Sequence, residues 1–405
     1  MCSHALFLWE RNSLDYCAET QKSNNTILKS KKYDEAVGKI VGTFLVVQIA
    51  NIVLRNTGII TSKISIVFFT TIFIARILYE LNCIKKTFPI AVYIECAFCG
   101  LTIISFILYP EAQDKITIRC LWTMTYCIPL YIFGKYVKDF NLFFRQTISA
   151  SFIALLLAIF AAIMHYIDPS LYRYSMSLGY ALLFPVLSFF SYAREKNVYL
   201  ILFLIGILII FLLGSRGPLI GVGIYSIFLV FEKKSRLFYI KCFFVLGLLA
   251  VLITSFQTLF VFFTDVFLGV EIQSRTISMI TEGIIFQDSG RFNIFNKFFD
   301  AIDVSPLWGY GIFAWESEFG YYPHNIFIEL IYSFGFLFGG VLSVLLVTKV
   351  VLGLFFSDEK AREVVRIVVL SSLPGLLVSG TFLQSPLFWL MMGFTGIKLN
   401  SFCKI

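Results

Sequence analysis

Twelve apolar runs occupy most of this chain and constrain its fold more than any other feature. Each is bounded by charged or turn residues, and about 20 apolar residues in a helix cross a bilayer. Hydrophobic residues make up 58% of the 405 residues and charged residues 14%, against about 45–50% and 25% in soluble domains. The sequence predicts an all-α polytopic membrane protein with about twelve transmembrane helices. The runs are residues 41–54, 64–81, 88–109, 120–134, 147–167, 177–192, 198–213, 217–231, 237–264, 324–356, 365–380 and 385–401.

The distribution of Lys and Arg predicts the orientation of these runs. If the N-terminus is cytoplasmic, 23 of these cations lie inside, nine lie outside and Arg76 lies within a span. This bias follows the positive-inside rule, so both termini are expected in the cytoplasm, and the first span acts as the insertion signal because no cleavable signal peptide precedes it. The net charge of +8 therefore does not indicate nucleic-acid binding. The predicted divisions are a cytoplasmic arm (1–39), nine helices (40–264), a periplasmic loop (265–323) and three helices (324–401).

Two features of the runs need separate interpretation. Cys96 and Cys99 form a C-x-x-C spacing, but they lie in the middle of a run, so we interpret them as small hydrophobic residues and not as a redox pair. The run 324–356 is longer than one straight span requires, which predicts a tilt, kink or break near Gly335, Gly339 and Gly340.

The connection 265–323 is too long and too aromatic to be a passive or disordered loop. Phe292, Phe295, Phe298 and Ile302 recur in it at helical spacing, which predicts an amphipathic helix on the outer surface. Eight Asp and Glu against three Lys and Arg give the connection a net charge of −5. Any anion bound there must therefore be held by local, preorganised groups.

Three short motifs stand at the starts of predicted helices on the outer face: Gly214-Ser215-Arg216-Gly217-Pro218, Ser289-Gly290-Arg291 and Pro323-His324-Asn325. A helix start presents free N–H groups and partial positive charge, and arginine adds a bidentate donor, so these motifs suit phosphate. Arg216 and Arg291 together are candidates to clamp a diphosphate, with Arg275 a weaker third. The alternative is that these arginines anchor span ends or pair with carboxylates.

His324 and Glu329 are the remaining candidate polar residues of this region. A helix start lowers the pKa of histidine, so His324 would stay neutral and accept a proton from a hydroxyl group; the alternative is an ordinary interfacial residue. Glu329 either supports this site or joins two helices. The chain has no Asp-x-Asp, zinc-site or nucleotide-binding motif, so we expect arginine to neutralise phosphate, with no metal and no cofactor.

Together these motifs resemble the C-terminal signature of the bacterial O-antigen polymerase and ligase superfamily. The resemblance is carried by Ser289-Gly290-Arg291-Phe292, by Ser305-Pro306-Leu307-Trp308-Gly309-Tyr310-Gly311, by Tyr321-Tyr322-Pro323-His324-Asn325 through Leu330, and by the Arg216 motif. It implies a C-type glycosyltransferase membrane fold and metal-independent, inverting transfer from undecaprenyl diphosphate on the periplasmic face of the inner membrane.

The resemblance also implies roles for individual residues. Arg216 and Arg291 would bind the diphosphate, and His324 would orient or deprotonate the acceptor hydroxyl. Arg275, Asn325, Tyr322, Trp308 and Glu329 would contact or support the substrate. Stacking of aromatic rings on sugar is one interpretation of Trp308 and Tyr322, and a membrane-interface belt is the other.

The residues of the Ser-Gly-Arg and Tyr-Pro-His-Asn motifs resemble a polymerase of lipopolysaccharide biosynthesis more than a ligase, which moves the finished chain to lipid A core. A flippase or transporter, and a non-catalytic scaffold, are further alternatives. The implied partners are the undecaprenyl-diphosphate-linked oligosaccharide and membrane lipid, with a chain-length regulator and a repeat-unit flippase as further candidates; no nucleic acid is implied.

Overall fold

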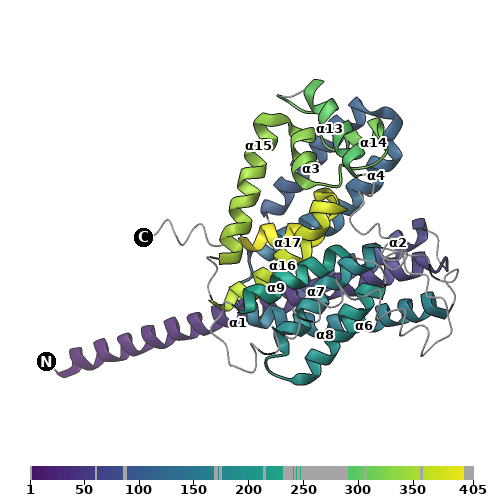
Figure 1. Ribbon diagram of the computed structural model, residues 1–405. Helices are drawn as coiled ribbons and strands as arrows, with labels where there is room; N and C mark the ends of the chain where they lie inside the picture. Colours follow the sequence, from purple (N-terminus) through teal and green to yellow (C-terminus); the bar gives the residue numbers. More distant parts are fainter. Residues whose placement is uncertain are drawn as a thin grey trace.

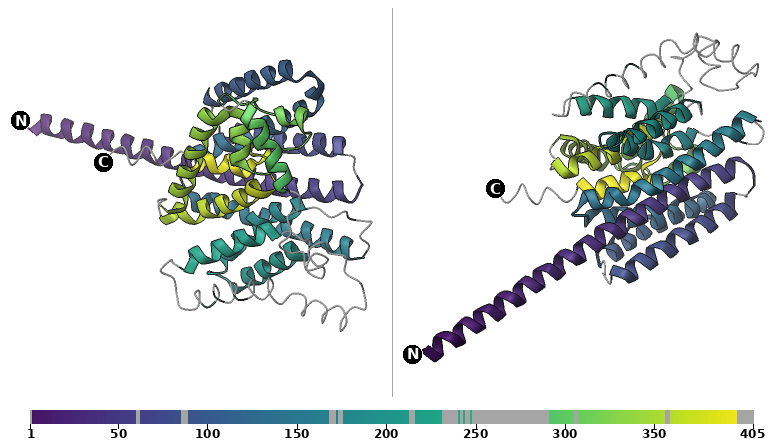
Figure 2. Two further views of the ribbon diagram at one scale, coloured as in Figure 1. Left: turned by 45° about the horizontal axis from the view of Figure 1, so that its top comes forward. Right: turned by 90° about the horizontal axis from the view of Figure 1, so that it is seen from below.

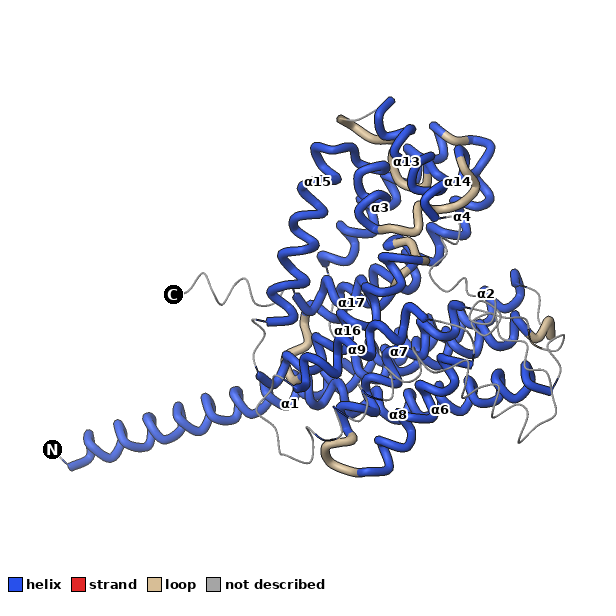
Figure 3. Tube along the Cα trace, in the orientation of Figure 1, coloured by secondary structure: helices blue, strands red, loops and turns tan. Residues whose placement is uncertain are grey.

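The computed structural model describes residues 2–59, 62–84, 89–167, 172, 176–212, 216–230, 240, 243, 247, 291–304, 307–355 and 359–395. Within these ranges the backbone forms helices joined by turns and contains no strand (Figure 3). The helices (Figure 1) are α1 (Cys2–Asn56), α2 (Ser62–Ile84), α3 (Pro89–Leu108), α4 (Gln113–Trp122), α5 (Ile128–Lys135), α6 (Phe140–Ile167), α7 (Met176–Tyr192), α8 (Asn197–Leu212), α9 (Arg216–Val230), α13 (Arg291–Val304), α14 (Ala314–Glu318), α15 (Ile326–Phe355), α16 (Glu359–Val378) and α17 (Pro386–Thr395).

Five of the described helical segments are long and apolar enough to cross a membrane, and they are joined by several shorter apolar helices. The protein is therefore a multi-pass membrane protein. The prediction of an all-α fold is confirmed for the described residues, in which the predicted runs lie mainly on helices; almost all of run 237–264 and residues 396–401 of the last run lie outside the described residues. The number of twelve spans and the orientation of the chain stay predictions. The five long segments are Ser30–Asn56, Ile64–Asn82, Pro110–Lys135, Phe140–His165 and Ile326–Phe355.

Helix α1 organises one side of the bundle. Its N-terminal part projects away from the other helices, and its C-terminal part packs along α2 and α6 (Figure 2). Gly38 and Gly42 are one turn apart at the α6 crossing, where a Cβ on Gly38 would lie 2.5 Å from the Phe143 carbonyl oxygen. Small residues spaced in this way let two membrane helices approach closely enough for van der Waals packing and so position α1 on α6.

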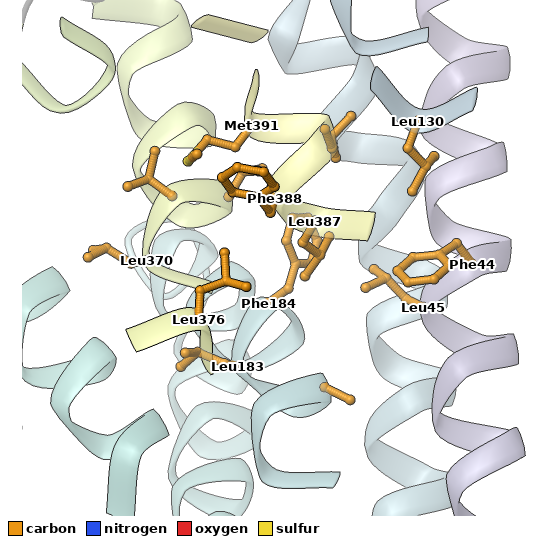
Figure 4. Close-up of a cluster of buried hydrophobic side chains, with 14 of the residues drawn as sticks. Phe44, Leu45, Leu130, Leu183, Phe184, Leu370, Leu376, Leu387, Phe388 and Met391 are labelled. Carbon is orange, nitrogen blue, oxygen red and sulfur yellow. The ribbon is translucent and has the colours of Figure 1, made fainter. Parts of the chain in front are cut away.

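Helices α7, α16 and α17 form the centre of the molecule. Figure 4 shows the apolar cluster that joins them to α1 and α5, in which Phe44, Phe184, Leu376 and Leu387 are all buried. Helix α17 lies against α5, and α16 also contacts α9 and α15. The ends of these helices are therefore held in fixed positions relative to one another, and the site described below is built on those ends.

Helix α15 is broken at Gly335, as the long glycine-containing run predicts. Gly335 has φ 69° and ψ 175°, which interrupts the helix. The interruption frees the carbonyls of Tyr332 and Ser333, which accept hydrogen bonds from Tyr310 N (2.9 Å) and Gly311 N (2.8 Å). A Cβ on Gly309 would lie 2.4 Å from Gly335 N, so only glycine fits this contact. The turn 307–311 is thus a structural clasp for the broken helix.

The predicted helix in the connection 265–323 is present as α13. Its apolar face packs on α15, where the Phe298 and Tyr332 rings are 5.0 Å apart and Tyr310 Oη donates to Ala301 O (2.8 Å). Phe292 and Phe299 point outward and are 67% and 48% exposed. The helix therefore has one face in the protein and one face outside it. Residues 265–290 lie outside the described residues.

Candidate functional site

A pocket of about 340 Å³ opens at the end of the bundle where α7 and α17 begin and α16 ends. Its walls come from α1, α7, α16, the α16–α17 connection, the start of α17 and the segment before α15. These segments are far apart in the chain, and three lining residues, Phe44, Leu376 and Leu387, belong to the apolar cluster of Figure 4. The lining residues are Phe44, Gln48, Met176, Ser177, Tyr180, Ala181, Tyr322, His324, Ser371, Ser372, Gly375, Leu376, Ser379, Gly380, Thr381, Gln384, Ser385, Pro386 and Leu387.

His324 lines this pocket in a strained conformation. Its φ is 58°, a left-handed value that is uncommon for residues other than glycine and concentrates at functional sites. Its Nδ1 is buried and has no hydrogen-bond partner among the described residues. Burial, followed by the positive charge of Arg291, lowers the pKa of His324 below its ordinary value. Both causes favour the neutral imidazole, the form in which histidine can accept a proton.

Tyr322 and Asn325 hold His324 from either side in the chain. The Tyr322 ring lies 4.4 Å from the imidazole, and its Oη donates to Ser379 O (2.8 Å), which ties the segment to the end of α16. Asn325 Oδ1 accepts from Phe327 N (2.9 Å) and Ile328 N (3.3 Å), so its oxygen caps α15. A substrate contact of the Asn325 amide nitrogen, and one of Tyr322, stay predictions.

The two predicted phosphate arginines stand at the first residues of α13 and α9. Arg291 is close enough to His324 for its charge to lower the histidine pKa. The backbone of Arg216 begins α9, and the next residue, Gly217, abuts Tyr180: a Cβ on Gly217 would lie 2.0 Å from the Tyr180 hydroxyl. Since Tyr180 lines the pocket, α9 starts at its edge. Arg275 lies outside the described residues.

Glu329 supports the site from behind. Its side chain is fully buried and accepts hydrogen bonds from Thr381 Oγ1 (2.5 Å) and Phe382 N (3.3 Å). Thr381 is a lining residue of the pocket. Glu329 therefore joins α15 to the α16–α17 connection beside the pocket, and a role in supporting the substrate stays a prediction.

Arg119 on α4 is a residue of this region that the sequence did not single out. It forms an ion pair with the buried Glu316, donates a hydrogen bond to Gln384 and lies 4.6 Å from the centre of the Trp315 ring. Gln384 lines the pocket, so Arg119 links α4 and α14 to the edge of the pocket. An arginine at the edge of an apolar run looks like an interfacial anchor, and no local pattern identifies partners 197 and 265 positions later.

Trp308 does not line the pocket. Its ring is 69% exposed and lies 6.2 Å from the Phe338 ring, on the outer side of the α15 clasp. Contact of Trp308 with substrate stays a prediction. Among the described residues, no group of three His, Cys, Asp or Glu side chains is arranged to hold a metal ion.

Comparison with known proteins adds one finding. Residues 201–345 match the family model described as O-antigen ligase. The matched region runs from α8 to the second half of α15 and contains Arg216, Arg291, His324 and Glu329. No curated protein matches the chain.

Proposed function

We propose that this chain, of which residues 201–345 match the O-antigen ligase family model, is a glycosyltransferase that polymerises lipid-linked O-antigen repeat units. The growing glycan on undecaprenyl diphosphate would be transferred to a sugar hydroxyl of another lipid-linked repeat. The reaction would take place on the periplasmic face of the bacterial inner membrane.

The observation that carries the proposal is the setting of His324. It lines the pocket with a left-handed backbone, and its buried Nδ1 has no hydrogen-bond partner among the described residues. The charge of Arg291, 33 positions earlier, helps to lower the pKa of His324. A neutral base beside a guanidinium suits a reaction in which a hydroxyl loses a proton while a phosphate leaves. Arg216 would complete the anion site from the start of α9.

In the proposed step, the acceptor oxygen attacks the anomeric carbon of the donor glycan. The hydroxyl proton passes to the His324 imidazole, the new glycosidic C–O bond forms, and the bond between the anomeric carbon and the phosphate oxygen breaks. The diphosphate leaves with the bonding electron pair, and Arg216 and Arg291 stabilise its charge. Attack opposite the leaving group inverts the anomeric configuration. Nothing in this step requires a metal.

A chain-length assay separates polymerase from ligase. In a strain lacking this protein, we expect lipopolysaccharide whose core carries a single repeat, because ligation continues and elongation does not. Core without any repeat would contradict the polymerase and favour the ligase. The preference for the polymerase rests on the Ser-Gly-Arg and Tyr-Pro-His-Asn motifs.

A second assay tests the enzyme class directly. Purified protein in detergent is incubated with synthetic lipid-diphosphate-linked repeats, and product length is read by gel or mass spectrometry. Longer glycans are expected, since group transfer needs no membrane gradient. If the products do not lengthen in detergent but repeats cross the membrane in proteoliposomes, the protein is a flippase and the proposal is wrong.

A further inference from the structure

The pocket beside His324 has a composition that suits an uncharged, hydroxyl-rich ligand. Eight hydroxyl side chains and two glutamines line it, with Phe44, Leu376 and Leu387 among the apolar residues. Within the described part of the chain, no Asp, Glu, Lys or Arg lines the pocket. Hydroxyls and amides both donate and accept hydrogen bonds, and tyrosine rings pack on sugar faces. Its volume of about 340 Å³ lies in the range of small-molecule sites.

Two polar atoms in this lining have no partner among the described residues: Gln48 Oε1 on α1 and Nδ1 of His324. Buried polar atoms are nearly always hydrogen-bonded, so each unpaired atom calls for an explanation. Here the two come from opposite ends of the sequence and meet in one pocket. A ligand hydroxyl can donate to each of them.

The charges around the pocket favour a sugar over the diphosphate inside it. The nearby Arg119 is already paired with Glu316, so its charge is largely neutralised. The arginine that acts on His324 is Arg291, which does not line the pocket. Moving a phosphate from water into a pocket without a cation carries a large desolvation free energy that no opposite charge offsets. His324 therefore stands between a cationic side, suited to the leaving group, and a neutral side.

We propose that this pocket is the acceptor site and holds the uncharged terminal sugar whose hydroxyl attacks the donor. Gln48 orients the sugar from α1, and His324 receives its reacting hydroxyl. The assignment rests on the function proposed above, because the acceptor is the substrate that must touch the base. It adds a substrate class and a recognition residue, Gln48, in a part of the chain outside the 201–345 match.

Binding of a lipid-free ligand tests the assignment without requiring turnover. The probe is the repeat-unit oligosaccharide released by mild acid from the lipid-linked pool of the source strain, and binding is followed by saturation-transfer NMR with purified protein. Gln48→Leu is expected to weaken binding about 5- to 10-fold, the equivalent of one hydrogen bond. Gly375→Leu is expected to abolish it, because a Cβ there lies 3.5 Å from the Tyr180 ring and a longer side chain fills the pocket.

Two matched variants control for damage to the bundle. Gly340→Leu makes the same change on α15, where a Cβ meets no atom within 4 Å, and Gln113→Leu removes an exposed glutamine from α4. Both should bind the oligosaccharide like the wild type. Gly375→Ala, whose Cβ makes only ordinary contact, should bind it at nearly wild-type strength and shows that the backbone tolerates substitution.

The outcomes separate the two proposals. Loss of oligosaccharide binding in Gly375→Leu and weakened binding in Gln48→Leu, with retained binding of a sugar-free lipid diphosphate, supports the acceptor site. Retained oligosaccharide binding in both variants overturns it, as does loss of lipid-diphosphate binding alone. If the wild type binds the oligosaccharide but never elongates the lipid-linked repeat, the acceptor site stands as a carbohydrate site and the polymerase proposal fails.

Discussion

The two ends of the helical bundle differ in the hydrogen bonding of their polar groups: the pocket end has bonded groups such as Glu329 and Tyr322, but it also has two that are unpaired among the described residues. At the end opposite the pocket, Asp34 accepts hydrogen bonds from Lys138 N and Asp139 N, both at 3.0 Å. Glu363 accepts from Ser191 Oγ (2.6 Å) and forms an ion pair with Arg194. At the pocket end, Gln48 Oε1 and His324 Nδ1 have no hydrogen-bond partner in the part of the chain that the structure describes.

This difference distinguishes polar groups that stabilise the fold through their hydrogen bonds from polar groups that are available to bind a ligand. A satisfied network lowers the free energy of the folded state, and its members lose partners when one is removed. An unpaired buried acceptor raises that free energy, so replacing it with an apolar side chain of similar size should not destabilise the folded state. Substitutions at the two ends should therefore affect different measurements: stability at the Glu363 end and glycan transfer at the His324 end.

The largest effect is expected for His324→Asn. Asparagine tolerates the left-handed backbone at this position but cannot take up the proton. Elongation should fall about 10²- to 10⁴-fold, while the thermal unfolding midpoint in detergent stays unchanged. Wild-type glycan lengths in a strain carrying this variant would contradict the catalytic role and favour a scaffold.

Arg291→Lys and Arg216→Lys come next. Lysine keeps the charge but cannot form the bidentate fork, so each variant should lose about 10²-fold in elongation. The loss is measured as single-turnover rate with saturating lipid-linked repeat. Lys297→Gln, on the same helix as Arg291, is the matched control and should elongate like the wild type. Equal losses in the control would mean that α13 is merely sensitive to its charge.

At the opposite end, Glu363→Ala should destabilise the protein by about 1–3 kcal/mol, because Ser191 and Arg194 lose their acceptor. The initial elongation rate per folded molecule should not change. The matched change at the pocket end, Gln48→Leu, should leave the unfolding midpoint equal or raise it. Urea or thermal unfolding in detergent measures both; a Gln48→Leu variant as unstable as Glu363→Ala would remove the distinction between the ends.

Several of these features were predictable from the sequence because they depend on local periodicity. The phenylalanine spacing predicts α13, and the glycines in an overlong apolar run predict the break in α15. The capping role of Asn325 has a local signal too, since Asn before an apolar run is a common helix N-cap. A joint role of Arg291 and His324 was expected only from the resemblance and stays a prediction; the positive charge of Arg291 is one cause of the lowered pKa of His324.

The features that the sequence did not predict depend on contacts between distant segments. The 307–311 turn clasps α15 through backbone hydrogen bonds, which leave no side-chain pattern. Gln48 lies on an otherwise apolar face of α1, and its role becomes visible only when α16 and the segment before α15 meet it in the pocket. The partners of Arg119 are likewise set by packing.

The smallest effect, and the one most specific to the pocket end, is a change in the protonation of His324. Burial and then the Arg291 charge lower the pKa of His324, so Arg291→Gln should raise it by removing one of these causes. The chain has only three histidines, so ¹⁵N-histidine NMR of the detergent-solubilised protein can follow each one, with His324→Asn identifying the signal. The wild-type imidazole should stay neutral at a lower pH than the imidazole of the Arg291→Gln variant. The acid limb of the pH profile of the elongation rate should therefore move to higher pH in Arg291→Gln. Lys297→Gln should leave the His324 titration in place. An unchanged titration in Arg291→Gln would show that burial alone sets the pKa and that the guanidinium does not act on the base.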